Sequence, residues 1–328
     1  MAGGRGERFW PMSQPDRPKQ FLSLFNDTPL ILQTMNRIKS NFKKDERLLI
    51  VPEELKDITY EHIGRERIIV EPMCRNAAAA ICLAAMVLKK KYGDGVMHIM
   101  PADHLISPRK NFIAALNFGH KLAQKGYLVT YGINPNRPET GYGYIEIGKK
   151  MKTLHTLHAF RGAGFAEKPS LKKAKVYIKS KKYLWNSGIF SLRIKDILDE
   201  IEYFIPRVYC GVANYLKKKS KRYFQQIPDI SIDYGVMEKS KKLCVVEGNF
   251  VWDDVGSWLA LERYFKKDKS HNIFIGDAKG LEIEDSILYT YGMPLKAYGI
   301  KGLIIVVSPY GVLVCKKDRA QDLKKLLR

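Results

Sequence analysis

Up to Ile133, the chain alternates between short apolar runs and amphipathic stretches whose apolar residues recur three and four positions apart. Apolar runs bounded by polar residues predict strands, and the wider spacing predicts helices. The predicted strands are residues 47–51, 67–70, 96–100 and 127–133, and the predicted helices are residues 28–39, 53–62, 76–92 and 109–125. This alternation favours an α/β fold, a mostly parallel sheet flanked by helices on both faces. In such sheets, ligands bind at the carboxyl ends of the strands.

The alternation ends near residue 134. Residues 134–144 are rich in Gly, Pro and Asn and predict a loop, and irregular strands and helices follow to about residue 269. Short β-rich pieces come next, at residues 273–275, 281–289, 303–307 and 311–315, and an amphipathic helix is predicted at residues 318–327. We therefore predict a large domain over residues 1–268 and a small β-rich domain over residues 269–328.

The composition is typical of a folded globular protein, with 45% hydrophobic and 27% charged residues. The longest strongly apolar stretch, residues 77–88, is shorter than the roughly 18 residues that a membrane-spanning helix needs. The N-terminus has no apolar segment of the signal-peptide type. The five cysteines show no zinc-binding spacing, so reduced thiols are expected. These features predict a cytoplasmic protein without a membrane partner.

The chain carries 56 Lys and Arg against 34 Asp and Glu, a formal net charge of +22. Such a basic chain raises the hypothesis of nucleic-acid binding. However, the lysines form several short, separate runs rather than one stripe interleaved with aromatic residues. We therefore predict no specific nucleic-acid partner. We expect the positive field to attract anionic small molecules such as nucleoside triphosphates and sugar phosphates.

The richest motif lies in the first twenty residues. It combines three glycines with three basic side chains, at Gly3, Gly4, Gly6, Arg5, Arg8 and Lys19. Glycines let backbone N–H groups approach an anion closely, and basic side chains add charge for a polyphosphate. The Walker A pattern is absent, and Phe9 stands where a dinucleotide fingerprint needs its third glycine. The motif predicts a phosphate-binding loop of another kind, the alternative being an ordinary Gly-rich turn.

The pattern Gly-Gly-x-Gly-x-Arg-Phe-x-Pro, followed by Pro-Lys, resembles the signature of sugar-1-phosphate nucleotidyltransferases. In its Glu-Arg-Phe-Trp-Pro form it is most similar to the mannose-1-phosphate guanylyltransferases. The resemblance implies a Rossmann-like nucleotidyltransferase fold of the GT-A type, with a mixed, mostly parallel sheet and a short β-helix-like tail. The tail itself shows no hexapeptide repeat.

Two acidic segments are candidates for a metal site. Asp103 follows a predicted strand, and a carboxylate there is well placed to hold Mg²⁺, although a turn or helix-capping role is the alternative. The Trp-x-Asp-x-Gly pattern around Asp254 resembles the family's second metal segment. The resemblance implies that Asp103 and Asp254 share Mg²⁺, while Asp253 caps or supports the loop.

Three further segments resemble the family's sugar site. The Glu167-Lys168-Pro169 string implies that Glu167 accepts hydrogen bonds from sugar hydroxyls and that Lys168 contacts the phosphate. The resemblance also implies that Asn186 forms another hydrogen bond to the sugar. It implies further that the loop with Gly141 and Gly143 lets the backbone approach the sugar closely. For the last two segments, a hairpin turn is the alternative.

The segment over residues 71–81 resembles the part of the family that lies near the nucleotide. Its Asn76 is a candidate nucleotide contact and is also typical of a helix N-cap. Ala77 and Ala79 stand where the family has Thr and Pro, which removes one hydroxyl contact. Asp233 lies in another matching segment, where a site role and a helix start are equally consistent with the sequence.

The reaction that the resemblance implies is mannose 1-phosphate plus GTP giving GDP-mannose plus pyrophosphate. No Ser-His-Asp or Cys-His nucleophile pattern occurs, which fits direct in-line attack. By the resemblance, five residues carry catalysis: Arg8, Lys19, Asp103, Lys168 and Asp254. Two alternatives stay open, namely another sugar 1-phosphate or nucleoside triphosphate, and a non-catalytic regulatory relative. The oligomeric state also stays open, with a homodimer as one option.

Members of this family place a buried strand immediately before the Gly-rich loop, whereas this sequence starts at Met1. Loss of a central strand would expose backbone groups on its neighbours and the apolar surface beneath it. We therefore expect a start several residues upstream, with Met1 as the last residue of that strand. The alternative is a truncated, unstable product.

Overall fold

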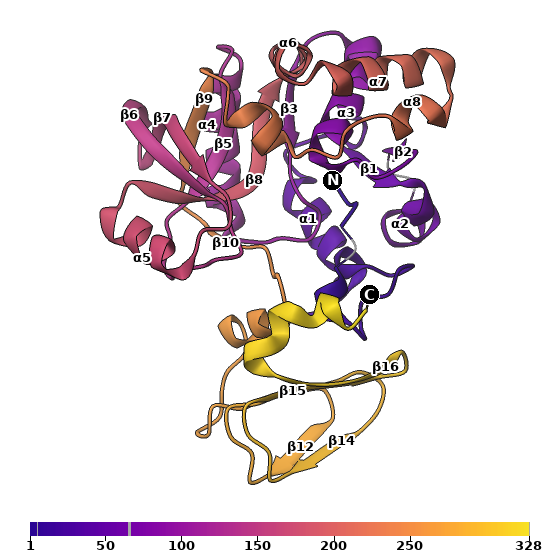
Figure 1. The fold of residues 1–328 in the computed structure, drawn as a ribbon, viewed down its shortest axis with the longest axis vertical. Helices are drawn as coiled ribbons and strands as arrows, with labels where there is room; N and C mark the ends of the chain where they lie inside the picture. Colours follow the sequence, from indigo (N-terminus) through magenta and orange to yellow (C-terminus); the bar gives the residue numbers. More distant parts are fainter. Residues whose placement is uncertain (5, 65–66, 328) are drawn as a thin grey trace. The chain divides into compact units, whose positions relative to one another are not determined.

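The structure, a computed structural model, describes residues 1–4, 6–64 and 67–327. The chain forms two compact units. The first contains residues 1–3, 37–101 and 105–252, and the second contains residues 4–36, 102–104 and everything described from Asp253 onward. Figure 1 shows the course of the chain through them.

The first unit is built on a six-stranded sheet with the order β3-β8-β5-β9-β7-β6. Its strands are β3 (Val96–Ile99), β5 (Leu128–Ile133), β6 (Tyr144–Leu154), β7 (Leu157–Ala166), β8 (Tyr183–Arg193) and β9 (Leu243–Gly248). Among the described pairings of this sheet, β5 and β9 run parallel and the others run antiparallel. Two further strands, β4 (Leu105–Ser107) and β10 (Val251–Asp253), pair with each other.

Helices cover both faces of this sheet. The helices of this unit are α2 (Lys56–Ile63), α3 (Asn76–Tyr92), α4 (Arg109–Ala123), α5 (Leu171–Ser180), α6 (Ile194–Phe204), α7 (Pro206–Lys218) and α8 (Lys221–Gln225). Of these, α2 packs against β1, and α8 packs against α7. Successive strand residues point to opposite faces, so Leu128 packs in the core with α3 and α6 while Val129 packs in the core with α4. The α/β arrangement with helices on both faces is therefore as predicted.

A smaller parallel pair, β1 (Leu48–Pro52) and β2 (Arg67–Glu71), completes the first unit. The start of the chain lies beside it, because the backbone N–H of Ala2 donates to the carbonyl of Ile50 at 3.0 Å. The amino group of Met1 donates to the carbonyl of Met100, just after β3, at 2.9 Å. The upstream start stays a prediction.

The strands and helices predicted up to Ile133 are all present near their predicted bounds. The share of parallel pairing is smaller than predicted. Of the strands after residue 143, β9 runs parallel to β5, but β6 and β7 enter the sheet as an antiparallel hairpin, and β8 runs antiparallel to β3, β5 and β6. The alternation of strands with helices in the first part of the chain did not predict these antiparallel strands. A parallel pair needs a crossover segment, usually a helix, whereas an antiparallel hairpin needs only a short turn.

The second unit contains a four-stranded sheet and a two-stranded sheet near the carboxyl end. The first consists of β11 (Ile273–Ile275), β13 (Ile287–Thr290), β15 (Leu303–Ser308) and β16 (Gly311–Lys316), and the second of β12 (Ala278–Leu281) and β14 (Leu295–Tyr298). The strand predicted at 281–289 was wrong, because β12 ends where it was to begin and β13 starts near its end. The predicted final helix is 3₁₀ (Lys317–Lys325). The boundary at residue 268 stays a prediction.

The N-terminal loop packs within the second unit. Phe9 is fully buried against Trp258, with ring centroids 5.2 Å apart, and the indole N–H of Trp258 donates to the carbonyl of Trp10 at 3.1 Å. Helix α1 (Leu30–Ile38) follows this loop in the chain. Over the described residues, helix length and hydropathy identify no candidate for a membrane span.

Candidate active site

Gly6 is the glycine that the conformation of the N-terminal loop requires. It has φ +63°, and a Cβ built there would lie 2.4 Å from Cβ and 2.7 Å from the backbone nitrogen of Lys19. Gly4 has no atom within 4 Å of such a Cβ, and Gly3 meets only the side chain of Pro52 at 3.7 Å. The left-handed conformation and close packing therefore depend on Gly6. Arg5 lies outside the described residues.

Lys19 joins the two acidic segments. Its side chain is buried, and its ammonium lies 2.7 Å from a carboxylate oxygen of Asp103. The same ammonium donates to the backbone carbonyl of Asp254 at 2.5 Å, a residue 235 positions away in sequence, and to that of Val255 at 3.2 Å. The second unit thus brings together Lys19, Asp103 and the Asp254 loop.

The Asp103 carboxylate is held ionised. Its burial by itself raises the pKa, but the charge of Lys19, the nearby His104 and the hydrogen bond from Lys19 outweigh this effect and keep the pKa below its usual value. The His104 ring nitrogen lies 3.8 Å from the second carboxylate oxygen. The side chain keeps 25% exposure, so a ligand can reach it.

Arg8 supplies a donor suited to an anion. One guanidinium nitrogen donates to the carbonyl of Gly256 at 3.3 Å. Its Nε is buried and has no hydrogen-bond partner among the described residues. A buried donor without a partner is unfavourable. The phosphate contact predicted for Arg8 stays a prediction.

Asp253 supports the loop that carries Asp254, which is the role predicted for it. It is 2% exposed and accepts two hydrogen bonds from Arg263, at 2.5 and 2.7 Å. It also accepts from the backbone N–H of Val255 at 2.8 Å. Val255 has φ +49°, which is unfavourable for a β-branched residue. The sequence did not identify Arg263 as the partner, because no local signal links it to Asp253.

We expect Asp253→Ala to lower the free energy of unfolding by about 2–4 kcal/mol, because it leaves Arg263 without its buried partner. Urea denaturation measures this change. The matched control is Asp322→Ala, which removes a carboxylate from an exposed ion pair with Lys325 and should change stability by less than about 1 kcal/mol. Equal urea midpoints for the two variants would contradict the structural role of Asp253.

In the first unit, Glu167 and Lys168 lie together after β7. Their charged groups are 3.2 Å apart, and both side chains are more than half exposed. Adjacent residues of an extended strand point to opposite sides, so a bend is needed to bring them together. Lys168 provides it with φ +42°. A Cβ built at Gly143 would lie 2.6 Å from a Glu167 carboxylate oxygen, so no side chain fits there without displacing that group.

Asn186 lies beside the same glycine. Its backbone N–H donates to the carbonyl of Gly143 at 2.8 Å, and its side-chain amide donates to Asp233 at 2.8 Å. The N–H of Gly141 donates to Glu139 at 3.1 Å. The predicted sugar residues Gly143, Glu167 and Asn186 are thus gathered in one unit. Asp233, which the sequence left undecided, begins a π-helical turn (Asp233–Met237) and also contacts Asn186.

Burial raises the pKa of Asp233 to about 6, with the Asn186 hydrogen bond opposing and the nearby Glu167 charge adding to the shift. The folded state therefore holds this proton more tightly than the unfolded chain, and this group's contribution to stability is lost as pH rises from about 4 to about 6. We expect Asp233→Asn to raise the unfolding free energy at pH 7.5 by on the order of 1 kcal/mol, and the gain to vanish near pH 4.

Denaturant unfolding at several pH values checks this expectation. Asp229→Asn is the matched control, because the exposed Asp229 also accepts from an asparagine, Asn76, at 3.0 Å. A pH-independent gain in Asp233→Asn, or the same pH-dependent gain in both variants, would contradict the assignment.

The N-cap predicted at Asn76 is wrong. Asn76 is the first residue of α3 with φ +63°, and the cap position is Arg75, without a side-chain capping bond. The Asn76 oxygen accepts from the adjacent N–H of Ala77 at 2.8 Å, and its amide donates to Asp229. The left-handed start turns the side chain toward Asp229. Its nucleotide contact stays a prediction.

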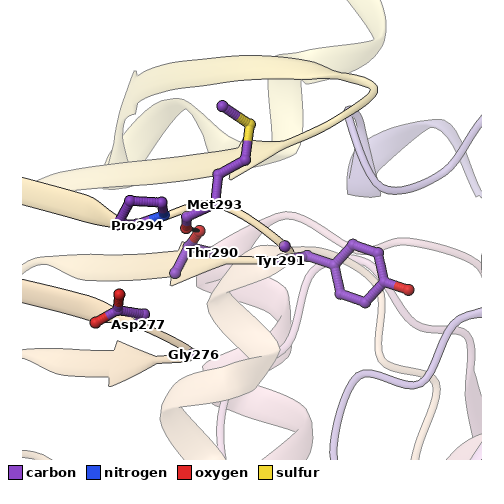
Figure 2. Close-up of a pocket in the computed structure, with 7 residues that line it drawn as sticks. Gly276, Asp277, Thr290, Tyr291, Met293 and Pro294 are labelled. Atoms are coloured by element: carbon purple, nitrogen blue, oxygen red, sulfur yellow. Dashed lines mark hydrogen bonds between the residues drawn. The ribbon is translucent and has the colours of Figure 1, made fainter.

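The small β domain has an open hollow of about 400 Å³ (Figure 2), lined by Gly276, Asp277, Thr290, Tyr291, Gly292, Met293 and Pro294. None of the predicted site residues lines it. The Thr290 hydroxyl donates to the carbonyl of Met293, so this polar group already has a partner.

Comparison with protein-family models identifies both parts of the chain. The model of the nucleotidyl transferase family matches residues 1–271. The model of the MannoseP isomerase/GMP-like beta-helix domain matches residues 276–328. The first match covers the Gly-rich loop, both acidic segments and the residues around Asn186.

Similar proteins agree with this family. Proteins from Klebsiella pneumoniae and from Escherichia coli K12, each named mannose-1-phosphate guanylyltransferase, are 37% and 35% identical to this chain. The first alignment covers 99% of this chain and 72% of the relative, and the second covers 100% and 72%.

Solved structures share the fold. A crystal structure from Thermus thermophilus, described as a mannose-1-phosphate geranyltransferase, matches with a TM-score of 0.90 and 34% identity over 100% of this chain and 96% of its own. A mannose-6-phosphate isomerase from Helicobacter pylori matches with a TM-score of 0.63 and 30% identity, covering 73% of this chain and 95% of its own. These findings confirm the resemblance read from the sequence: the chain is an enzyme of the nucleotidyl transferase family, in the branch whose curated members are named mannose-1-phosphate guanylyltransferases.

Proposed function

We propose that this enzyme transfers GMP from GTP to mannose 1-phosphate and forms GDP-mannose and pyrophosphate. The observation that carries the proposal is the Lys19 ammonium, which is held on Asp103 and on the backbone of Asp254 beside the Gly-rich loop. The curated relatives' name supports the choice of sugar and base. The same proposal assigns catalysis to residues 1–268 and a β-helix-like tail to residues 269–328.

The donor chemistry fits Mg²⁺. Asp103 offers an ionised, partly exposed carboxylate that already attracts a cation, the Lys19 ammonium. Within the described part of the chain, no cluster of three or more His, Cys, Asp or Glu could hold a metal. Mg²⁺ commonly takes only one or two carboxylates together with phosphate oxygens and water. We therefore propose that Asp103 and Asp254 hold Mg²⁺, which when bound would neutralise charge on the α-phosphate.

The chain's own groups would bind the triphosphate. The unpartnered Nε of Arg8 and the amides of the loop at Gly3, Gly4 and Gly6 would bind the β- and γ-phosphates and stabilise pyrophosphate as it leaves. Lys19 would lie next to the transferred phosphoryl group. Its two backbone acceptors fix the position of its charge before substrate binds.

In the first unit, the chain would hold the acceptor. Glu167 would accept hydrogen bonds from sugar hydroxyls, and Asn186 would form a further hydrogen bond with the sugar. Gly141 and Gly143 would allow the sugar to come close to the backbone. Lys168 would orient the sugar phosphate. A phosphate oxygen of the sugar attacks the α-phosphorus, and the bond from the α-phosphorus to the bridging oxygen of the β-phosphate breaks. Positioning and charge neutralisation then supply most of the catalysis.

The test is pyrophosphate release with GTP and Mg²⁺, with and without mannose 1-phosphate, and identification of the product. Release that depends on mannose 1-phosphate, with GDP-mannose formed, supports the proposal. Other sugar 1-phosphates and nucleoside triphosphates are tested in the same assay. Faster release with another pair would replace the proposed substrates. A folded enzyme that releases no pyrophosphate with any pair would overturn the catalytic role itself.

A further inference from the structure

Arg137 belongs to the loop that carries Gly141 and Gly143, and its side chain lies over a cluster of aromatic rings. Its guanidinium carbon is 4.8 Å from the ring centroid of Trp185 and 5.6 Å from that of Tyr142. Both rings are buried and pack edge to face at 5.3 Å. Tyr142 also packs against Trp252 at 5.0 Å. The cation thus covers a buried aromatic surface inside the first unit.

Polar contacts connect Arg137 to the backbone of the same loop. Its Nε pairs with a carboxylate oxygen of Glu139 at 3.2 Å, and another of its nitrogens donates to the Tyr142 hydroxyl at 3.2 Å. The other carboxylate oxygen of Glu139 accepts from the N–H of Gly141 at 3.1 Å. The Tyr144 hydroxyl donates to the Glu139 carbonyl at 2.9 Å. Arg137 therefore fixes Glu139, and Glu139 fixes the backbone around Gly141.

The loop in turn contacts Asn186 and Glu167, two residues proposed to bind the sugar, and so helps to fix their positions. Trp185, under the guanidinium, is followed directly by Asn186, whose N–H donates to Gly143 at 2.8 Å. Gly143 also packs so closely to Glu167 that a Cβ there would be 2.6 Å from its carboxylate. A shift of Gly143 would therefore move the backbone partner of Asn186 and the neighbour of Glu167 together.

Arginine suits this place better than lysine. Its planar guanidinium stacks on a ring and donates to Glu139 and Tyr142 at the same time, whereas an ammonium is a compact, strongly hydrated charge. A loop held in its binding conformation before the ligand arrives loses less freedom on binding. The ion pair by itself is partly exposed, with side chains 28% and 21% accessible, so the stack supplies much of the restraint.

We propose that Arg137 is a positioning residue for the sugar 1-phosphate, holding residues 137–143 in the conformation that aligns Gly143 with Asn186 and Glu167. This proposal rests on the proposed function for its substrate. It names a residue that would act through the loop rather than by touching the reacting atoms.

Steady-state kinetics of Arg137→Ala and Arg137→Lys test the proposal. We expect Arg137→Ala to raise KM for mannose 1-phosphate about tenfold and to change KM for GTP less than about twofold, with Arg137→Lys between it and the native enzyme. The matched control is Arg161→Ala, since Arg161 also stacks on a ring, Tyr127, at 4.9 Å and donates to the carbonyl of Lys241 at 2.9 Å. An unchanged KM for mannose 1-phosphate, or an equal rise in both constants, would overturn the proposal.

Amide hydrogen exchange separates this proposal from the proposed function. Arg137→Ala should speed exchange in residues 139–144, whereas Arg161→Ala should not. If the native enzyme forms no GDP-mannose, the proposed function fails, and the kinetics are repeated with whichever sugar 1-phosphate supports pyrophosphate release. If exchange in this segment is unchanged by Arg137→Ala, the positioning role fails whatever the substrate is.

Discussion

Asp103→Asn is expected to lower turnover at least ~100-fold, because it removes the ionised ligand proposed for Mg²⁺. The carboxylate is kept ionised by Lys19, 2.7 Å away, and an amide can neither carry that charge nor hold the ammonium as firmly. Pyrophosphate release across a range of Mg²⁺ concentrations measures the loss. The fold should persist, since the side chain is 25% exposed.

Asp318→Asn is the control, because it makes the same chemical change at an exposed position of the second unit. It should keep native turnover at every Mg²⁺ concentration. Near-native turnover of Asp103→Asn at low Mg²⁺ would rule out Asp103 as a metal ligand. Circular dichroism of both variants shows whether any loss comes from unfolding.

Gly6→Ala is expected to lower turnover by about 100-fold, because the new methyl group would displace Lys19. The Cβ would come within 2.7 Å of a backbone nitrogen, which moves only with its chain, and 2.4 Å of the Lys19 Cβ. Lys19 holds Asp103 and the carbonyls of Asp254 and Val255, so its displacement disturbs the whole cluster. Pyrophosphate release at saturating substrates measures the effect.

Gly299→Ala separates steric displacement from backbone strain. Gly299 has φ +64°, close to the +63° of Gly6, but a Cβ built on it would meet no atom within 4 Å. Both variants should lose about 1 kcal/mol of stability from the left-handed conformation. Gly6→Ala alone should lose activity. Equal turnover in the two variants would show that the contact between Gly6 and Lys19 does not matter for catalysis.

Local pattern predicted the elements of the first half of the chain well. Helix α3 (Asn76–Tyr92) has the predicted bounds. Strand β5 (Leu128–Ile133) begins one residue later than predicted and ends at the predicted residue. These segments have a continuous apolar face or run, and burial of that face is what the pattern reports. Strand β14 (Leu295–Tyr298) was missed because its residues are half-buried or exposed, so no apolar run marks it.

Sequence alone determined which residues are candidates for the proposed reaction. The glycines, Arg8, Lys19 and the acidic and amide residues were identified because motifs are contiguous in the chain. Tertiary structure decided which of them meet: Lys19 reaches a carbonyl 235 positions away, Asn186 reaches Asp233, and Asp253 finds Arg263. It also decided that β6, β7 and β8 run antiparallel to their neighbours. Such pairings depend on the path of the chain between distant segments, and local periodicity carries no record of that path.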